Sequence, residues 1–287
     1  ENFYSNGKLL ITGEYLVLHG ALALAVPVRT GQEMIVSPGH EDHVLRWESY
    51  YEGRCWFEAR FSVPGMKILS TSDPDTADYL KNILEQAGKM NKGFLETKSS
   101  WYIRANLGFD RTWGLGSSSS LISNIASWFG IDPFKLFFAT QKGSGYDIAC
   151  ARADGPIWYR LMIGSPVIQK VNFDPPFADK LAFVYSGAKQ DSSASVSKFL
   201  DSVRFTGTAR QRITDIGREL PMATSLMEFD ALINEHEDIM SDLLGLPKVH
   251  DERFLDYQGS IKSLGAWGGD FLLATHESGH KAIRDYF

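Results

Sequence analysis

The sequence lacks several features that would assign it to a common protein class. Its 287 residues include two cysteines, Cys55 and Cys150, too few for a disulfide scaffold and typical of a reducing compartment. No uninterrupted apolar run approaches the length of about 18 residues that a membrane span needs, so we expect no membrane partner. Because the net charge is −6 and there is no long basic run, we also expect no nucleic-acid partner. These absences predict a cytoplasmic protein, and we expect a few residues to precede Glu1.

Two widespread nucleotide-binding motifs are missing as well. The chain has no Gly-x-x-x-x-Gly-Lys-Ser/Thr sequence, so it contains no P-loop. It also has no Gly-x-Gly-x-x-Gly that follows a strand and opens a helix. What the sequence does contain is 44% hydrophobic residues, which is enough for a large core in one or two domains.

Hydrophobic periodicity predicts mainly strands in the first part of the chain and mainly helices later. Strands are predicted at residues 9–12, 15–18, 23–28, 34–37, 44–48, 55–61, 101–105, 157–163, 181–185 and 271–274. Helices are predicted at residues 75–90, 121–129, 133–139, 195–203, 209–219, 225–244 and 276–286. This order predicts an α+β protein in two lobes. The proline pair at 175–176 marks the expected boundary, which divides the chain into residues 1–174 and 175–287.

One glycine- and serine-rich run lies between a predicted strand and a predicted helix. An apolar stretch from Leu121 follows it at once. The run reads Trp113-Gly114-Leu115-Gly116-Ser117-Ser118-Ser119-Ser120. A helix N-terminus presents unpaired N–H groups and partial positive charge, and a preceding glycine leaves room for a phosphate beside them. The run therefore predicts a polyphosphate-binding loop; the alternative is an ordinary capped turn before a helix.

Four further segments carry glycines beside charged or hydroxyl side chains. They are residues 7–20 (GKLLITGEYLVLHG), 143–151 (GSGYDIACA), 186–193 (SGAKQDSS) and 262–270 (KSLGAWGGD). In this order, and together with the run at 113–120, they resemble the motifs of the superfamily named for galactokinase, homoserine kinase, mevalonate kinase and phosphomevalonate kinase (the GHMP kinases). The resemblance extends from about Gly7 to Leu273.

Within the superfamily, the sequence resembles two subfamilies in different respects. The segment from Gly143 to the pair Tyr159-Arg160 resembles phosphomevalonate kinases. Tyr15 also favours them, because mevalonate kinases usually have histidine at that position. The short length is nearer to mevalonate kinases, so both subfamilies remain open.

The resemblance implies roles for the matching residues. Asp147 is the implied catalytic aspartate, and Lys8 is the implied cation near the reacting phosphoryl group. Ser118 is the implied Mg²⁺ ligand. The residues implied to hold the phosphates of ATP are Gly114, Leu115, Gly116, Ser117, Ser118 and Ser119. The residues implied to bind the substrate are Glu14, Tyr15, Lys142, Ser144, Gly145, Lys189, Gly265, Gly268 and Gly269.

Each of these residues has a simpler interpretation when it is taken alone. Asp147 is also suited to cap the short apolar helix that follows it. Lysine is usually a solvated surface residue, which applies to Lys8 and to the candidate contacts for an anionic substrate, Lys142, Arg111 and Lys189. The glycines from Gly265 onward are also suited to an ordinary turn before a buried strand.

The sequence departs from the mevalonate kinase pattern in three places. Leu136 lies eleven residues before Asp147, where those enzymes have a glutamate that binds Mg²⁺. Mg²⁺ tolerates sparse protein ligation, so Ser118, phosphates and water, with or without Asp147, remain a sufficient set. The stretch between Ser118 and Asp147 is also shorter than usual. In the third motif, Trp267 and Asp270 replace expected glycines.

A literal match to a zinc-protease motif occurs near the end of the sequence. His276-Glu277-Ser278-Gly279-His280 matches His-Glu-x-x-His. We interpret it as a polar terminal helix, because Gly279 weakens a helix and no later His or Glu supplies a third ligand.

The predicted function is therefore that of an ATP- and Mg²⁺-dependent kinase acting on mevalonate or phosphomevalonate. The resemblance implies an N-terminal lobe like the second domain of ribosomal protein S5, which binds ATP, and a C-terminal ferredoxin-like lobe. The expected partners are a small alcohol or phosphate acceptor and a second copy in a homodimer. Two alternatives stay open: a diphosphomevalonate decarboxylase, which the Gly-Leu-Gly form of the loop disfavours, and a catalytically inactive ligand-binding relative, which the missing glutamate favours.

Overall fold

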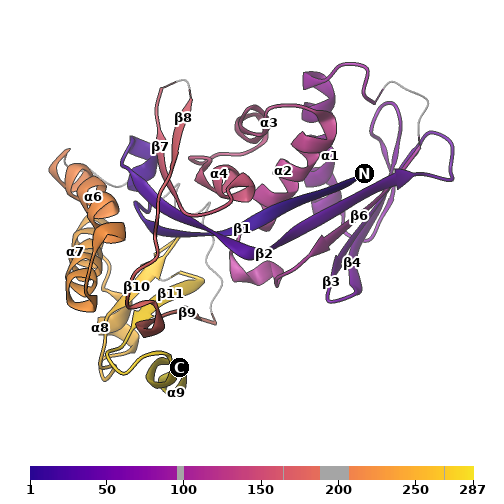
Figure 1. The fold of residues 1–287 in the computed structure, drawn as a ribbon. Coiled ribbons are helices and arrows are strands. Elements are labelled where there is room, and N and C mark those ends of the chain that lie inside the picture. Colours follow the sequence, from indigo (N-terminus) through magenta and orange to yellow (C-terminus); the bar gives the residue numbers. More distant parts are fainter. Residues whose placement is uncertain (96–99, 164, 188–206, 268) are drawn as a thin grey trace. The chain divides into compact units, whose positions relative to one another are not determined.

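The computed structural model describes residues 1–95, 100–163, 165–187, 207–267 and 269–287, and its architecture is mixed α/β (Figure 1). The expected helix at 195–203 and the candidate residues Lys189 and Gly268 lie outside the described residues. In the part of the chain that is described, no helix has the length and apolar character that crossing a membrane requires.

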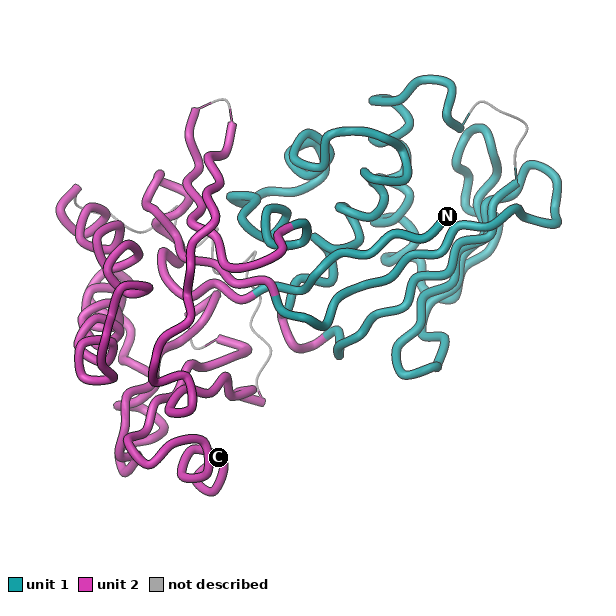
Figure 2. The backbone as a smooth tube through the Cα atoms, in the orientation of Figure 1, with its two compact units in different colours: residues 1–8, 28–111, 115–152 teal, residues 9–27, 112–114, 153–287 magenta. Residues whose placement is uncertain are grey.

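The chain divides into two compact units, each made of several segments (Figure 2). Unit 1 contains residues 1–8, 28–111 and 115–152, and unit 2 contains residues 9–27, 112–114 and 153–287. Strands β1 (Asn2–Thr12) and β2 (Ala23–Pro38) each run through both units. The expected boundary at 174–175 falls inside unit 2; as a statement about domains, it stays a prediction.

Unit 1 is built on a mostly antiparallel sheet. Its strands follow the order β5, β4, β3, β6, β2, and β1 pairs with β2. Within that order, β3 and β6 are the parallel pair. The strands not yet given are β3 (Val44–Tyr51), β4 (Arg54–Ser62), β5 (Ile68–Thr71) and β6 (Trp101–Leu107). The alternation that predicted half-buried strands is present, because Leu45 and Trp47 are buried while Arg46 between them is exposed.

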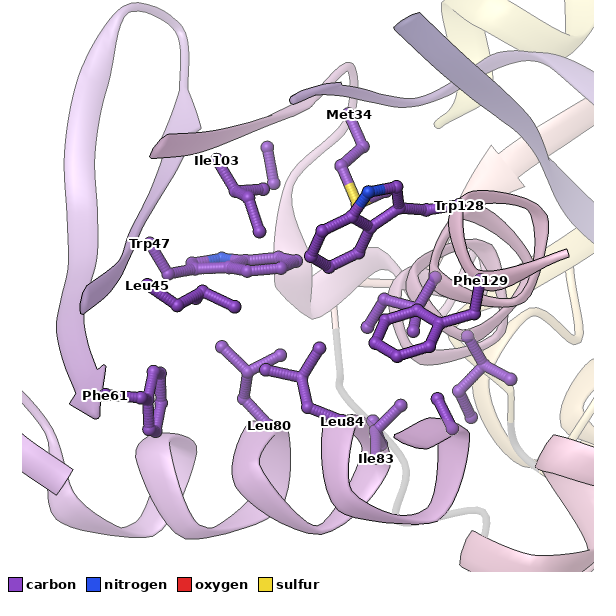
Figure 3. Packing of buried hydrophobic residues seen from close by; sticks show 14 of the residues in the cluster. Met34, Leu45, Trp47, Phe61, Leu80, Ile83, Leu84, Ile103, Trp128 and Phe129 are labelled. Atoms are coloured by element: carbon purple, nitrogen blue, oxygen red, sulfur yellow. The ribbon is translucent and has the colours of Figure 1, made fainter. Parts of the chain in front are cut away.

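Helices of unit 1 supply the other side of its core. They are α1 (Pro74–Met90), α2 (Ser117–Phe129), α3 (Pro133–Thr140) and α4 (Tyr146–Arg152). Figure 3 shows Leu80 and Leu84 of α1 beside Trp47 of the sheet, with Phe129 of α2 in the same cluster. Each of these side chains is at most 2% exposed, so each contributes roughly 1.5–3 kcal/mol of apolar burial.

Unit 2 combines a three-stranded antiparallel sheet with helices. The sheet order is β10 (Ile261–Leu264), β11 (Phe271–Thr275), β9 (Leu181–Tyr185). The α-helices are α6 (Gly207–Glu219), α7 (Leu226–Leu244), α8 (Val249–Arg253) and α9 (His280–Tyr286). The hairpin β7 (Ile157–Leu161) and β8 (Pro166–Lys170) joins the start of β2 through the pair Ala23↔Tyr159. Short 3-10 helices are η1 (Leu16–His19), η2 (Arg111–Trp113, shared with unit 1), η3 (Ala178–Lys180) and η4 (Leu220–Met222).

Some expected elements differ from the observed ones. The predicted strand at 15–18 is the 3-10 helix η1, since Gly13 (φ 91°) and Tyr15 (φ 58°) turn the chain sharply before it. A short apolar run fits a strand and a buried helical turn equally well. The pattern at 15–18 therefore predicted the wrong element. The strands predicted at 23–28 and 34–37 are one strand, β2. The terminal helix begins at His280 rather than residue 276, after Gly279 at φ 77°.

Candidate functional site

The glycine-serine run places an uncapped helix N-terminus in unit 1. Helix α2 begins at Ser117, so all four serines lie in its first turn. Gly116 precedes it at φ 89° and offers no side chain to cap the helix. A Cβ on Gly116 would lie 2.8 Å from Ser119 Oγ and 3.1 Å from Lys8 Cγ, so glycine is required by conformation and by space. The Ser120 N–H donates to Gly116 O, and the backbone N–H groups that precede it in this turn are those positioned to bind an anion.

Lys8 lies beside this turn. Its backbone N–H donates to Leu115 O at 2.9 Å, and its Nζ lies 5.6 Å from the centre of the Tyr146 ring. Burial lowers the pKa of Lys8, but Tyr146 and Asp147 outweigh it, so the pKa lies above its usual value. Lys8 therefore carries a positive charge at neutral pH, next to the N-terminus of α2.

Asp147 lies in the first turn of α4, close enough to Lys8 for the two charges to interact. Its Oδ1 accepts a hydrogen bond from the Ile148 N–H at 3.1 Å, so part of the helix-capping interpretation holds. Burial by the surrounding protein raises the pKa of Asp147, and the charge of Lys8 opposes that rise. The side chain is half-buried, so it retains access to solvent. A carboxylate with a raised pKa beside a lysine is suited to hold or accept a proton.

Cys150 lies one turn after Asp147 and is fully buried. Burial, with Asp147 adding to it, raises the pKa of the Cys150 thiol far above its usual range. The thiol is therefore protonated, and we assign it no chemical role.

Ser118 has a partner that the sequence did not reveal. Its Oγ is hydrogen-bonded to the hydroxyl of Tyr79 on α1. Burial raises the pKa of Tyr79, and Asp147 raises it further, so this hydroxyl stays protonated. Helical spacing places Tyr79 on the apolar face of α1 and indicates packing there; nothing in the sequence pairs it with Ser118.

The loop between α3 and α4 carries three of the expected substrate contacts. Ser144 is buried, and Gly145 at φ 81° accepts the Ala149 N–H as α4 begins. Lys142 is exposed. Arg111 lies elsewhere in unit 1, with its guanidinium 3.7 Å from the centre of the Trp56 ring. Of the basic candidates that the structure describes, Lys8 is thus the one beside Asp147.

In unit 2, the Glu14 carboxylate is enclosed in an ion cluster. Lys262 Nζ lies 2.7 Å from Glu14 Oε1, and His236 Nε2 lies 3.0 Å from Glu14 Oε2. Glu237 Oε1 is 3.5 Å from the same lysine nitrogen. Burial raises the pKa of Glu14, but Lys262 and His236 outweigh it and lower the pKa. The carboxylate expected to contact substrate is therefore paired inside the protein.

The two residues that α7 contributes to this cluster also have shifted pKa values. Burial lowers the pKa of His236, and the charge of Lys262 lowers it further. Burial also raises the pKa of Glu237 to about 7, although Lys262 opposes the rise. The sequence segment at 262–270 included Lys262, but neither residue from α7 was singled out there.

The third motif forms a tight loop in unit 2. Gly265 has φ 79°, and the Gly269 N–H donates to Ala266 O at 2.8 Å. Trp267 packs within the unit: its backbone N–H donates to the Tyr15 hydroxyl at 2.8 Å, and its Nε1 donates to Pro247 O at 3.0 Å. This loop is thereby joined to the turn that precedes η1.

Asp270 lies directly against Gly114. A Cβ on Gly114 would overlap the Asp270 carboxylate, so the absence of a side chain at 114 makes room for the acidic residue. Two departures noted in the sequence, Trp267 and Asp270, therefore both have packing roles inside unit 2. Gly265 and Gly269, like Tyr15, stay predictions as substrate contacts.

The zinc-protease pattern is not held on one helix face. His276 lies in the turn before α9, and its Nδ1 accepts the Ser278 N–H at 3.0 Å. His280 Nε2 lies 2.5 Å from Leu181 O, and Glu277 pairs with Lys180. Among the described residues, no group of three or more His, Cys, Asp or Glu side chains is arranged to hold a metal ion.

The comparisons with known proteins give matches in structure. No family model matches the sequence, and no curated protein matches it. Streptococcus pneumoniae phosphomevalonate kinase, solved with phosphomevalonate and AMPPNP, is similar with a TM-score of 0.73 at 16% identity over 99% of this chain and 95% of that one. Methanococcus jannaschii mevalonate kinase has a TM-score of 0.71 at 15% identity, covering 99% and 94%. Lactococcus lactis galactokinase, solved with galactose, has a TM-score of 0.65 at 13% identity, covering 100% and 87%.

The chain has the fold of these kinases. The expectation of a GHMP-type fold is thereby confirmed, and so is its mixed α/β class. Identity of 13–16% establishes the fold alone, so the acceptor and the residue roles are matters for proposal. The description of the lobes as S5-like and ferredoxin-like stays a prediction.

The structure gathers the expected unit 1 residues more closely than the sequence could show. Lys8, Ser118 and Asp147 come from β1, α2 and α4, and Tyr79 joins them from α1. Leu136, which stands where a Mg²⁺-binding glutamate was expected, is fully buried in the core. The oxygens that could face a magnesium ion are the Ser118 hydroxyl and the Asp147 carboxylate, which are hard ligands of the kind Mg²⁺ prefers.

Proposed function

We propose that this protein is an ATP-dependent kinase that phosphorylates a small hydroxyl- or phosphate-bearing acceptor, with mevalonate and phosphomevalonate as the first candidates. One observation carries the proposal. A lysine and a half-buried carboxylate lie beside the uncapped, glycine-preceded N-terminus of α2, all within unit 1. Phosphoryl transfer requires a site that holds polyphosphate, a positive charge that offsets the charge of the transferred group, and a group that accepts a proton.

In the proposed reaction, the N–H groups of the first turn of α2 hold the phosphates of ATP. Lys8 offsets negative charge that develops on the transferred group. When bound, Mg²⁺ would neutralise phosphate charge, and Ser118 and Asp147 would hold it. Asp147 orients an alcohol acceptor and takes its proton; where the acceptor oxygen belongs to a phosphate, Asp147 instead orients Lys8 and the acceptor. Transfer is direct and in line, without a covalent enzyme intermediate.

The structural neighbours support the choice of acceptors. The S. pneumoniae phosphomevalonate kinase structure contains phosphomevalonate and AMPPNP, and the Leishmania major mevalonate kinase structure contains R-mevalonate at 17% identity and a TM-score of 0.69. The L. lactis galactokinase structure contains galactose, so sugars belong in the same panel. We propose Ser144, Gly145 and Lys142 as acceptor contacts, because their loop leads directly into Asp147.

The test is ATP turnover on mevalonate, phosphomevalonate and galactose. Asp147→Asn is expected to lower turnover about 10²–10⁴-fold, the range typical of losing a catalytic acid or base. Asp154→Asn is the matched control, because its carboxylate is exposed and pairs with Lys170. Full activity of Asp147→Asn would disprove the mechanism, and release of carbon dioxide from diphosphomevalonate would indicate the decarboxylase.

A second candidate function is that of a ligand-binding relative without turnover. The observation that favours it is Leu136, fully buried where a Mg²⁺-binding glutamate was expected. Nucleotide binding measured by calorimetry, with no turnover on any acceptor, would support it. We further propose that the protein is a cytoplasmic homodimer. Light scattering measures the oligomeric state.

A further inference from the structure

Unit 2 contains a basic pocket lined by residues that have no role in the proposed reaction. It lies where the end of η1, the end of β7 and the first turns of α6 meet, and its volume is about 620 Å³. Its polar lining comes from His19, Arg160, Arg210, Gln211 and Thr214. No aspartate or glutamate lines it among the described residues, although the whole chain carries a net charge of −6.

The two arginines of this pocket have no acidic partner among the residues that the structure describes. The acids of the neighbouring helix are engaged elsewhere. Asp215 lies 3.2 Å from Arg218 Nη1 and accepts from Gln211 Nε2 at 2.9 Å. Arg212 pairs with Glu219 and Glu235. The positive charges of the two arginines at the pocket are therefore not balanced by a carboxylate among the neighbouring residues that the structure describes.

Arg160 also has an unmet hydrogen-bonding requirement. Its Nε is buried and has no partner within the described structure, while the side chain as a whole is half-buried. A buried donor that lacks an acceptor is costly. Arg210 is held near the same opening, because its Nη1 donates to His19 O at 3.3 Å.

The field in the pocket also favours an anion. Burial lowers the pKa of His19, and the charge of Arg210 lowers it further, so a neutral imidazole lies beside the guanidinium. Arg210 and Gln211 lie in the first turns of the 13-residue helix α6, whose N-terminus adds partial positive charge.

We propose that this pocket binds the phosphate group of a small phosphorylated molecule. Two uncompensated guanidinium groups match the dianionic charge of a phosphate monoester, whereas one carboxylate would leave a positive charge unneutralised. Guanidinium groups also bind phosphate oxygens in pairs, which adds geometric selectivity. The phosphate could belong to a phosphorylated product of the proposed kinase or to a separate effector.

The first experiment titrates the full-length chain with inorganic phosphate, by calorimetry or phosphorus NMR. Saturable binding is expected, weakened about tenfold or more by Arg160→Gln and by Arg210→Gln. Arg218→Gln is the matched control, since it removes an arginine of the same helix that points to Asp215; it is expected to change affinity less than twofold. Absence of saturable binding, or equal weakening in all three variants, would overturn the proposal.

Two variants separate binding at this pocket from binding at the proposed kinase site and from the effects of misfolding. In a Lys8→Met background, which disables the proposed catalytic site, the arginine-dependent phosphate binding is expected to persist. If Arg160→Gln fails to fold because it removes buried packing, the exposed Arg210 still gives the answer. Loss of all phosphate binding in Lys8→Met would show that the anion binds at α2 instead, and would overturn the proposal.

Kinetics then identify the source of the phosphate. For a phosphorylated product, Arg210→Gln is expected to weaken inhibition by phosphomevalonate at least tenfold while the KM for mevalonate changes little. For a separate effector, the inhibition constant of phosphomevalonate and the KM for mevalonate both stay constant while phosphate binding falls. The pocket as a phosphate site is supported by either result, provided that the direct titration shows the arginine dependence.

Discussion

Lys262 Nζ and Glu14 Oε1 are 2.7 Å apart, and neither side chain is more than 4% exposed. The two residues are separated by 248 positions in the sequence. The pair therefore joins the turn after β1 to the strand that leads into the glycine-rich loop of unit 2. Because both charges have been removed from water, each depends on the other.

Removing one partner of this pair is expected to destabilise the protein strongly. Lys262→Met should lower the free energy of unfolding by roughly 3–5 kcal/mol, because it leaves a buried carboxylate without its main counter-charge. Urea unfolding followed by circular dichroism measures the change. Lys281→Met is the control: Lys281 is 79% exposed and pairs with Asp285, so its loss should leave stability nearly unchanged. A double variant, Glu14→Gln with Lys262→Met, should recover part of the loss.

Glu237 should make stability fall as pH rises. Burial raises its pKa to about 7, above the ordinary value of 4.5, so the folded state holds a proton that the unfolded state has released. Its contribution is present below pH 4.5 and is lost as pH rises through about 7, on the order of 3 kcal/mol in all. Glu237→Gln should remove this dependence.

The measurement is the difference in unfolding free energy between wild type and Glu237→Gln from pH 5 to pH 8. The difference isolates Glu237 because its neighbours Glu14, Lys262 and His236 remain in both proteins. His236 has a lowered pKa, so its own contribution runs the other way and is lost as pH falls. A difference that does not vary with pH would contradict the prediction.

Tyr79 should matter for nucleotide binding through Ser118. Tyr79→Phe removes the hydroxyl that bonds to Ser118 Oγ and leaves the ring in place. We expect Mg-ATP to bind about 3- to 10-fold more weakly, the effect of one hydrogen bond, while ATP without metal changes less. Calorimetry with and without Mg²⁺ measures both. Tyr102→Phe, whose hydroxyl bonds to Glu48, is the matched control and should leave both affinities unchanged.

Gly116 should be irreplaceable for reasons of space as well as conformation. Gly116→Ala places a methyl group 2.8 Å from Ser119 Oγ at φ 89°, so we expect at least tenfold weaker nucleotide binding. Gly130→Ala, at the other end of α2, has φ 64° and open space around the added carbon. Both variants should lose about 1 kcal/mol of stability from the left-handed backbone, and Gly116→Ala should lose more because of its contact with Ser119. Equal nucleotide affinity in both would contradict the proposed role of the loop.

The elements that the sequence predicted correctly have local signals. Helix α3 begins where Asp132 accepts the N–H groups of Phe134 and Lys135 and where Pro133 fixes the first turn. Gly130 lies between the helices predicted at 121–129 and 133–139, and it ends α2 in a left-handed conformation. Caps and breaks of this kind depend on neighbouring residues, so one sequence is enough to find them.

Contacts between distant segments explain what the sequence did not reveal. Glu14 was expected near substrate because of its motif, and its partners His236 and Lys262 come from parts of the chain that no local pattern connects to it. Tyr79 fitted the spacing of a core residue, and its hydrogen bond to Ser118 crosses 39 positions. Helical periodicity identifies the buried face of α1, but it does not show that one hydroxyl on that face reaches another helix.

The two thiols differ in a way that is useful to the experimenter. Cys150 is buried and its thiol has a raised pKa, whereas Cys55 is exposed at the start of β4. A maleimide dye should therefore attach to Cys55 alone in the native protein, at a single defined point of unit 1. Cys55 is therefore a single site for fluorescent labelling, and no cysteine needs to be engineered.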